Sequence, residues 1–172
     1  MTNPLESHIR NIPDFPIPGI QFKDITTLLR DGAALHQAID VFVARYRNQR
    51  IDAVVAIESR GFIFGAPLAY ALGIGMVPVR KKGKLPADTY SVEYALEYGS
   101  AILEIHKDAL PNHARVIIID DLLATGGTIA AACQLVEMAG GQVVETAFLI
   151  ELSMLEGRKK LHQYPIFSQI TY

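Results

Sequence analysis

Two adjacent carboxylates and a short loop of glycine and threonine follow one apolar run of the chain. The run is Val116 to Ile119, four β-branched residues that predict a buried strand. Asp120 and Asp121 close it, and the loop Ala124-Thr125-Gly126-Gly127-Thr128 then leads into an Ala-rich helical pattern. Carboxylates can hold hydroxyl groups or a divalent cation, and loop amides at a helix N-terminus can hold a phosphate. A ligand that carries both kinds of group is a sugar phosphate.

The loop residues have the chemistry that a phosphate needs. Glycines let backbone N–H groups point inward, often with positive φ, and leave no Cβ in the way. Thr125 and Thr128 add hydroxyl donors, and Thr128 is expected to cap the following helix. Each piece alone would also suit an ordinary strand-to-helix turn. The complete order of strand, acid pair, loop and helix favours the phosphate site.

Two further polar clusters follow apolar runs. Glu58-Ser59-Arg60-Gly61 ends one run, and Arg60 can bind phosphate oxygens in a bidentate way, although a surface salt bridge is the alternative. Gly61 would let a helix start closely behind. The other cluster places four cations within five positions: Arg80, Lys81, Lys82 and Lys84. They could mark a solvated strand end, or they could compensate the charge of a pyrophosphate group.

The elements that must position these clusters alternate along the chain. Apolar periodicity predicts helices over 31–49, 61–73 and 128–140, and strands over 51–58, 76–82, 100–110, 116–121 and 142–151. This alternation predicts an α/β fold with a doubly wound, mostly parallel sheet. Ligands bind beyond the carboxyl ends of such strands, so the three clusters should share one rim.

The remaining segments are expected to surround this core, which spans 31–150. Short helices are predicted over 4–11 and 152–161, followed by an irregular tail, and residues 1–30 and 151–172 should form a small lid. The polar, Tyr-rich segment 83–99 is predicted to be a flap that excludes water, or a hairpin arm that packs on another subunit.

Composition limits the possible partners. Half of the 172 residues are hydrophobic and 20% are charged, which suits one folded domain, and the net charge of −2 favours neither nucleic acid nor membrane as a partner. No signal-peptide pattern or membrane span is evident, so a cytoplasmic protein is expected. The single cysteine, Cys133, should be a small buried residue, and the five scattered histidines receive no catalytic role.

The string VIIIDDLLATGGT resembles the phosphoribosyl-pyrophosphate motif of the type I phosphoribosyltransferase family. With PDFPIPGIQFKDITTLL, ESRGFIFG, RKKGKLP and LEYG, in order from near residue 13 to near residue 160, the chain resembles the adenine-specific branch of that family. The resemblance implies the conversion of adenine and phosphoribosyl pyrophosphate to AMP and pyrophosphate, a purine-salvage step. It also implies Mg²⁺ as cofactor and a homodimer.

The resemblance implies a role for each donor-side residue. Asp120 and Asp121 should hold the ribose hydroxyls, with Mg²⁺ reaching them through substrate or water. The 5-phosphate should lie on the loop residues Ala124, Thr125, Gly126, Gly127 and Thr128. The pyrophosphate group should contact Ser59, Arg60, Arg80 and Lys84. Arg60 and Lys84 should assist catalysis, and family members often carry a non-proline cis peptide just before this arginine.

The resemblance also implies how the base is held. Adenine should stack between Phe22 and Leu155, while the main chain of Gln21 and Lys23 reads its edge. Glu97 in the flap should act as general acid or base at the adenine nitrogen. Two alternatives stay open: another base on the same chemistry, or a regulator that keeps the fold without activity.

Overall fold

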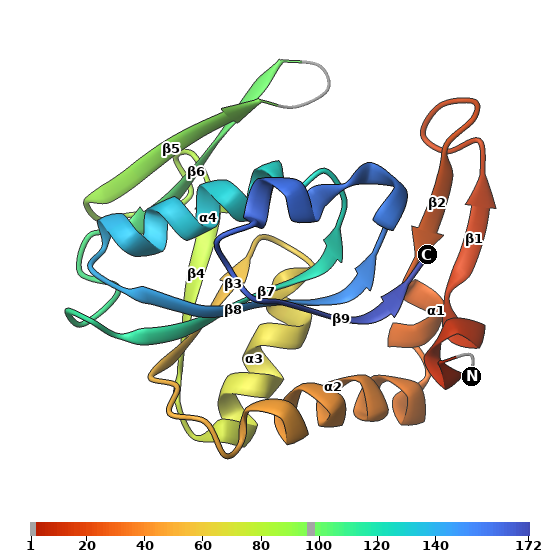
Figure 1. Ribbon diagram of the computed structural model, residues 1–172, viewed down its shortest axis with the longest axis horizontal. Coiled ribbons are helices and arrows are strands. Elements are labelled where there is room, and N and C mark those ends of the chain that lie inside the picture. Colours follow the sequence, from red (N-terminus) through yellow and green to blue (C-terminus); the bar gives the residue numbers. More distant parts are fainter. Residues whose placement is uncertain (1–2, 96–98) are drawn as a thin grey trace.

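The computed structural model describes residues 3–95 and 99–172, and a seven-stranded sheet forms its centre (Figure 1). The strand order is β5-β6-β4-β3-β7-β8-β9. The strands are β3 (Ala53–Ile57), β4 (Gly75–Lys81), β5 (Thr89–Ala95), β6 (Ser100–His106), β7 (Arg115–Leu123), β8 (Gln142–Glu151) and β9 (Ile166–Thr171). The five from β4 to β9 run parallel, whereas β5 and β6 are antiparallel. The predicted doubly wound α/β fold is confirmed.

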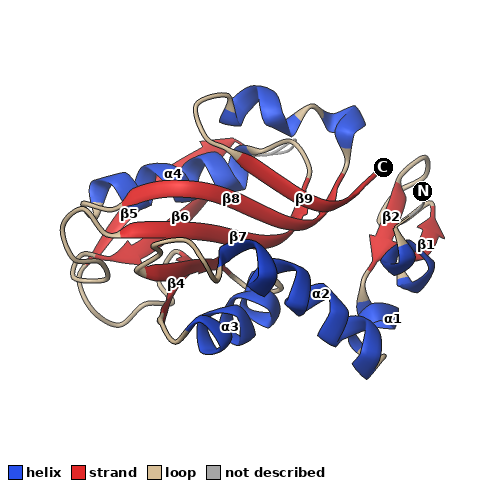
Figure 2. Ribbon diagram, turned by 60° about the horizontal axis from the view of Figure 1, so that its bottom comes forward, coloured by secondary structure: helices blue, strands red, loops and turns tan. Residues whose placement is uncertain are grey.

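Helices cover both faces of this sheet. Figure 2 shows α2 (Gly32–Tyr46) and α3 (Gly61–Leu72) on the side opposite α4 (Gly127–Met138). Asp31 caps α2 because its carboxylate accepts from the amides of Ala33 and Ala34, at 3.0 and 3.1 Å. Long apolar runs such as Val116 to Ile119 are buried because both faces of the sheet are covered.

The core therefore has two layers. On the α2–α3 side, Phe42 and Phe64 meet edge to face, with ring centroids 6.3 Å apart. On the α4 side, Cys133 packs with Ile118 and Phe148 and has no exposed surface. Burial raises the pKa of the Cys133 thiol to about 12, helped by the charge of Glu137. The prediction of a buried cysteine is confirmed.

Several expected elements differ from those observed. The predicted helix over 4–11 is a single 3-10 turn, η1 (Pro4–His8), followed by strand β1 (Arg10–Pro13). The predicted helix over 152–161 is two 3-10 turns, η2 (Ser153–Leu155) and η3 (Gly157–Leu161). The tail expected to be irregular forms β9, because Ile170 and its neighbours complete the apolar edge of the sheet.

The two chain ends meet beside the sheet. β1 pairs with β2 (Gln21–Asp24) in a separate two-stranded sheet, and the short helix α1 (Thr26–Leu29) links it to the core. The side-chain amide of Asn3 donates to the carbonyl of Gln169 at 2.7 Å. The Lys23 ammonium lies 3.7 Å from the centre of the Tyr172 ring. These contacts fix the N-terminal hairpin against the last strand.

Candidate functional site

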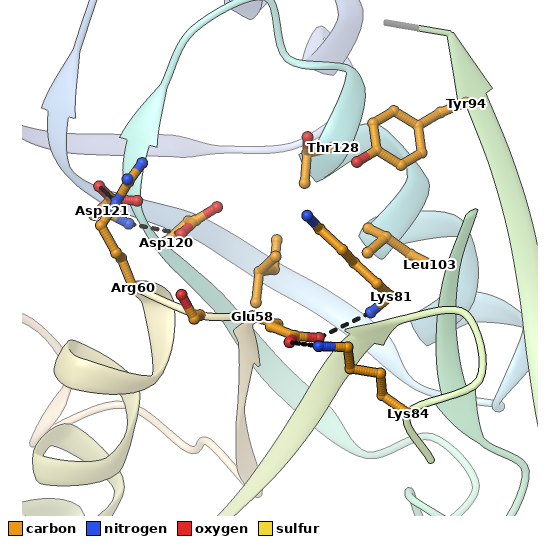
Figure 3. Close-up of a pocket in the computed structure, with 11 residues that line it drawn as sticks. Glu58, Arg60, Lys81, Lys84, Tyr94, Leu103, Asp120, Asp121 and Thr128 are labelled. Atoms are coloured by element: carbon orange, nitrogen blue, oxygen red, sulfur yellow. Dashed lines mark hydrogen bonds and ion pairs between the residues drawn. The ribbon is translucent and has the colours of Figure 1, made fainter. Parts of the chain in front are cut away.

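The carboxyl ends of β3, β4 and β7 meet around a cavity of about 360 Å³ (Figure 3). Its lining combines residues of both charges: Glu58, Ser59, Arg60, Lys81, Lys84, Asp120 and Asp121. A second cavity of about 200 Å³ is lined by Arg60 and by residues 120–129. The two cavities share Arg60, Asp120, Asp121 and Thr128. The predicted rim of three polar clusters is therefore present.

The Gly/Thr loop wraps the N-terminus of α4. Gly126 has a φ of +80°, and a Cβ there would lie 2.6 Å from the carbonyl oxygen of Gly157, so both conformation and space require glycine. Gly126 is the N-cap residue, and no side chain of the described residues caps it. The expectation that Thr128 caps α4 is therefore wrong, since Thr128 lies inside the first turn. The first amides of α4 face the second cavity without a side-chain cap, which suits an anion.

The acid pair lies within β7, which runs on to Leu123 and does not end at Asp121 as expected. The Arg60 Nε donates to Asp121 Oδ2 at 2.5 Å, and the Asp121 amide donates to Asp120 Oδ1 at 2.9 Å. Burial and the neighbouring charge of Asp121 raise the pKa of Asp120 well above its ordinary value. The raised pKa favours the protonated form of Asp120, which can both donate to and accept from a hydroxyl group.

Gly61 brings helix α3 close behind the acid pair. A Cβ at this position would lie 2.8 Å from the carbonyl oxygen of Ile119 and 3.1 Å from Asp120 Oδ1. Glycine is therefore needed for the close approach, as the sequence predicted. A non-proline cis peptide is present in this loop between Glu58 and Ser59, one residue earlier than the position expected before Arg60.

The basic cluster is organised by a carboxylate that was not among the predicted site residues. Glu58 pairs with Arg80 and Lys84, each at 3.2 Å. Burial alone would raise the pKa of Glu58, but hydrogen bonds from Arg80, the Lys81 amide and Lys84 lower it to about 2. The Lys81 side chain extends across the cavity toward Thr128 (Figure 3). Lys81 and Lys84 thus line the cavity and Arg80 is held by Glu58 at its wall, whereas Lys82 is exposed and lines neither this cavity nor the second one.

The residues expected to hold a base lie at the chain ends. Phe22 is on β2, and its ring meets that of Phe15 edge to face at 5.1 Å. Gln21, also on β2, accepts from the side-chain amide of Asn11 at 2.8 Å. Leu155 lies exposed on η2. The base contacts of these residues and of Lys23 stay predictions.

The flap is partly described. Residues 83–99 were expected to form a polar flap, and β5 within them pairs with β6 as an antiparallel hairpin whose Tyr94 lines the larger cavity. Glu97 lies outside the described residues, so its catalytic role stays a prediction. Tyr94 was noted in the sequence only as part of a Tyr-rich segment. The alternation of apolar and polar residues around Tyr94 indicates a strand, and this pattern could have predicted that the Tyr94 side chain lies on the inner face of the hairpin.

Within the described ranges, no three side chains of His, Cys, Asp or Glu gather as a metal site. The acid pair alone offers two carboxylates. None of the described helices is long and apolar enough to cross a membrane. Any divalent cation here needs oxygen ligands from a bound molecule as well as from the protein.

Comparisons with known proteins agree with this site. Residues 25–170 match the model of the phosphoribosyl transferase domain. The chain is 68% identical to the adenine phosphoribosyltransferase of Chloroflexus aurantiacus over 98% of its length and 97% of that protein. It is 65% identical to the adenine phosphoribosyltransferase of a Roseiflexus species over the full length of both.

Solved structures give the same result. The adenine phosphoribosyltransferase from Thermoanaerobacter pseudethanolicus superposes with a TM-score of 0.94 at 55% identity, covering 98% of each chain. The enzyme from Giardia lamblia complexed with 9-deazaadenine gives a TM-score of 0.93 at 40% identity, covering 100% of this chain and 98% of that one. From its site, its fold and these matches, the chain belongs to the adenine phosphoribosyltransferases of the phosphoribosyltransferase family.

Proposed function

We propose that the protein transfers the phosphoribosyl group of phosphoribosyl pyrophosphate to adenine, giving AMP and pyrophosphate. The single observation that carries the proposal is the pair of adjoining cavities, one lined by the Gly/Thr loop and one by the basic cluster, with Asp120 and Asp121 between them. A molecule with a phosphate at one end, a pyrophosphate at the other and hydroxyls between matches this arrangement. The relatives of known activity support adenine as the acceptor.

The donor would be held along its whole length. Its 5-phosphate would accept hydrogen bonds from the amides of Ala124 to Thr128, and its ribose hydroxyls would donate to Asp120 and Asp121. Arg60, whose Nε donates to Asp121, would bind the pyrophosphate through its other guanidinium nitrogens, joined by Ser59, Arg80 and Lys84. Because these groups are fixed before the reaction, they stabilise the negative charge that develops as pyrophosphate leaves C1 of the ribose.

The base would approach from the side of the chain ends. Adenine would stack on Phe22 under Leu155, and the main chain at Gln21 and Lys23 would recognise the exocyclic amine. Adenine N9 would form its bond to C1 as the bond from C1 to the pyrophosphate oxygen breaks. Glu97 would take the proton released from the adenine. A site built for this amine rejects hypoxanthine, which would leave a buried acceptor unpaired.

Magnesium fits the residues present. The carboxylates of Asp120 and Asp121, which line the cavity, are hard oxygen ligands of the kind Mg²⁺ prefers, and phosphate oxygens and water would supply the rest. Bound there, Mg²⁺ would neutralise part of the pyrophosphate charge. Arg60, Arg80 and Lys84 would carry the remainder.

The active form would be a homodimer. Helix α3 exposes Ile63 and Tyr70, which line an apolar cavity of about 440 Å³ together with Leu35 and Ile39 of α2. An exposed apolar surface of this kind suits association with a second copy. Light scattering during gel filtration should give a mass of twice 18.9 kDa. Substitution Tyr70→Glu should shift that mass toward the monomer.

A panel of bases tests the activity. Purified protein with phosphoribosyl pyrophosphate and Mg²⁺ would be mixed separately with adenine, hypoxanthine, guanine, xanthine and orotate, and nucleotide formation followed. AMP from adenine alone is the expected result. Turnover of another base would keep the donor site and contradict the adenine contacts, whereas no turnover with any base would favour a regulator.

A further inference from the structure

Glu58 is a carboxylate in an otherwise basic part of the cavity. It follows β3 directly, and its side chain is only 11% exposed at the wall of the larger cavity. Three cationic side chains reach that wall beside it: Arg60, Lys81 and Lys84. A carboxylate here opposes the binding of a negatively charged group, so its presence needs a reason.

Both oxygens of Glu58 are engaged by the end of β4. Oε2 accepts from Arg80 Nε at 3.3 Å and from the Lys81 amide at 3.1 Å. Oε1 lies 3.2 Å from Arg80 Nη2. It also lies 3.2 Å from Lys84 Nζ, the contact drawn in Figure 3. The carboxylate thus binds two of the cations expected to hold pyrophosphate. In the proposed complex, phosphate oxygens would be the alternative partners of Arg80 and Lys84.

The two cations differ in how firmly Glu58 holds them. Arg80 meets the carboxylate through two nitrogens, and its Nη1 also donates to the carbonyl of Lys84 at 3.3 Å. Lys84 contributes one ammonium group, and its side chain is 50% exposed on a flexible stem. Lys84 can therefore leave Glu58 for another anion at little cost, while Arg80 stays oriented.

We propose that Glu58 is an internal counter-ion for the pyrophosphate site, which holds Lys84 and Arg80 when the site is free and yields Lys84 to the bound pyrophosphate. This inference rests on the proposed function and adds a positioning residue to it. The carboxylate prevents mutual repulsion of the cations in the free protein. Glu58 also lowers the affinity for pyrophosphate, because pyrophosphate must compete with the carboxylate for Lys84. The lower affinity allows this product to dissociate.

Substitution Glu58→Gln tests the proposal because it removes the charge and keeps nearly the same shape. Isothermal titration with magnesium pyrophosphate should show binding about threefold to tenfold tighter than in the parent, the range expected from losing one partly screened charge interaction. AMP affinity should change by less than about twofold, because AMP carries no pyrophosphate. Damage to the site would lower affinity, so a gain separates the counter-ion role from a structural one.

Glu104→Gln is the matched control. Glu104 is a buried carboxylate on β6, directly opposite Arg80 in the sheet register, and accepts from the Gly83 amide at 2.9 Å and Ser91 Oγ at 3.1 Å. It forms none of the ion pairs found among residues 3–95 and 99–172. Its loss should leave pyrophosphate affinity within about twofold. An equal gain in this variant would overturn the proposal.

Unchanged or weaker pyrophosphate binding in Glu58→Gln would also overturn the proposal that Glu58 is a counter-ion. If that variant does not fold, Glu58→Asp decides: the shorter side chain draws back from Lys84, and a gain of about twofold or more is expected. Equal or lower affinity would count against the counter-ion. A parent protein that forms AMP and binds pyrophosphate, with no gain in either variant, refutes only this inference. A parent that binds no pyrophosphate refutes the proposed function with it.

Discussion

Two carboxylates at the same edge of the sheet hold their cations in different ways. Glu58 after β3 is partly buried and Glu151 at the end of β8 is buried, with side chains 11% and 5% exposed, and each pairs with a cation that is half exposed. Arg158 meets Glu151 through two short bonds of 2.6 and 2.7 Å, and Ser168 adds a third at 2.7 Å. The contacts of Glu58 to cationic side chains measure 3.2 to 3.3 Å and are shared between two cations. Geometry, more than burial, distinguishes a fixed pair from an exchangeable one.

The fixed pair supports the Gly/Thr loop from behind. Arg158 belongs to η3, whose first residue Gly157 packs against the loop so closely that a Cβ would lie 2.3 Å from the carbonyl oxygen of Ala124. Glu151 therefore anchors the segment on which the loop rests. The sheet edge thus has a rigid part that supports the Gly/Thr loop and an exchangeable part at the proposed pyrophosphate site.

The largest effect is expected at the acid pair between the two parts, from Asp120→Ala combined with Asp121→Ala. Loss of the ribose contacts and of the Arg60 partner should lower kcat/KM at least about a thousandfold. Circular dichroism and the thermal midpoint should show a folded protein. Full turnover would end the assignment of the site, and a collapsed fold would place the acid pair among the fixed groups.

A large loss of stability is expected in the fixed part. Arg158→Met leaves the Glu151 carboxylate buried with Ser168 as its remaining partner, which should cost about 2 kcal/mol in urea unfolding. Lys159→Met is the control, because its pair with Glu156 is exposed and should contribute less than about 0.5 kcal/mol. If both variants lose the same stability, the contrast between fixed and exchangeable pairs fails.

Lys84→Met should change donor binding while leaving the stability of the fold nearly unchanged. The exposed ammonium contributes less than about 0.5 kcal/mol to folding, but the KM for phosphoribosyl pyrophosphate should rise about tenfold. Initial rates at varied donor concentration measure this. Lys82→Met is the neighbouring control, since Lys82 is exposed and does not line the described cavities around the acid pair; equal effects of the two substitutions would contradict a specific role for Lys84.

The smallest expected effect is a change with pH in the stability that the Arg158–Glu151 pair contributes. The Arg158 hydrogen bonds, opposed by burial and helped by Ser168, lower the pKa of Glu151 below its ordinary value of 4.5. A lowered folded-state pKa contributes stability above pH 4.5, which is lost as pH falls through the folded value. The stability advantage of the parent over Arg158→Met should therefore shrink as urea titrations move below pH 4.5. A constant difference down to pH 2 would exclude this pair as its source.

Contiguous features of the site could be predicted from the sequence, and features that join distant segments could not. The acid pair and the loop 124–128 lie within one string, so local chemistry was enough to identify them. The contacts of Glu58 span 22 residues to Arg80 and 26 to Lys84, and no periodicity relates those positions. Glu58 was visible as part of ESRG, but its partner depended on β4 lying beside β3.

The same limit explains the differences in the fold. The run IFSQIT is short and half polar, and only its pairing with β8 makes it a strand. Residues 4–11 place Leu5 and Ile9 four positions apart, a spacing that suits a helix. Asn3 and Glu6 instead close a single 3-10 turn, and β2 pairs with the following residues in a hairpin. Tertiary pairing overrode local preference in both places.

Cys133 makes the packing of α4 measurable by chemistry. It is the only cysteine of the chain, it has no exposed surface, and burial holds its pKa near 12. An alkylating reagent that needs the thiolate can therefore react only when α4 leaves the sheet. The rate of labelling at increasing urea concentration therefore reports the separation of α4, the helix that follows the Gly/Thr loop, from the sheet. No cysteine has to be introduced for this measurement.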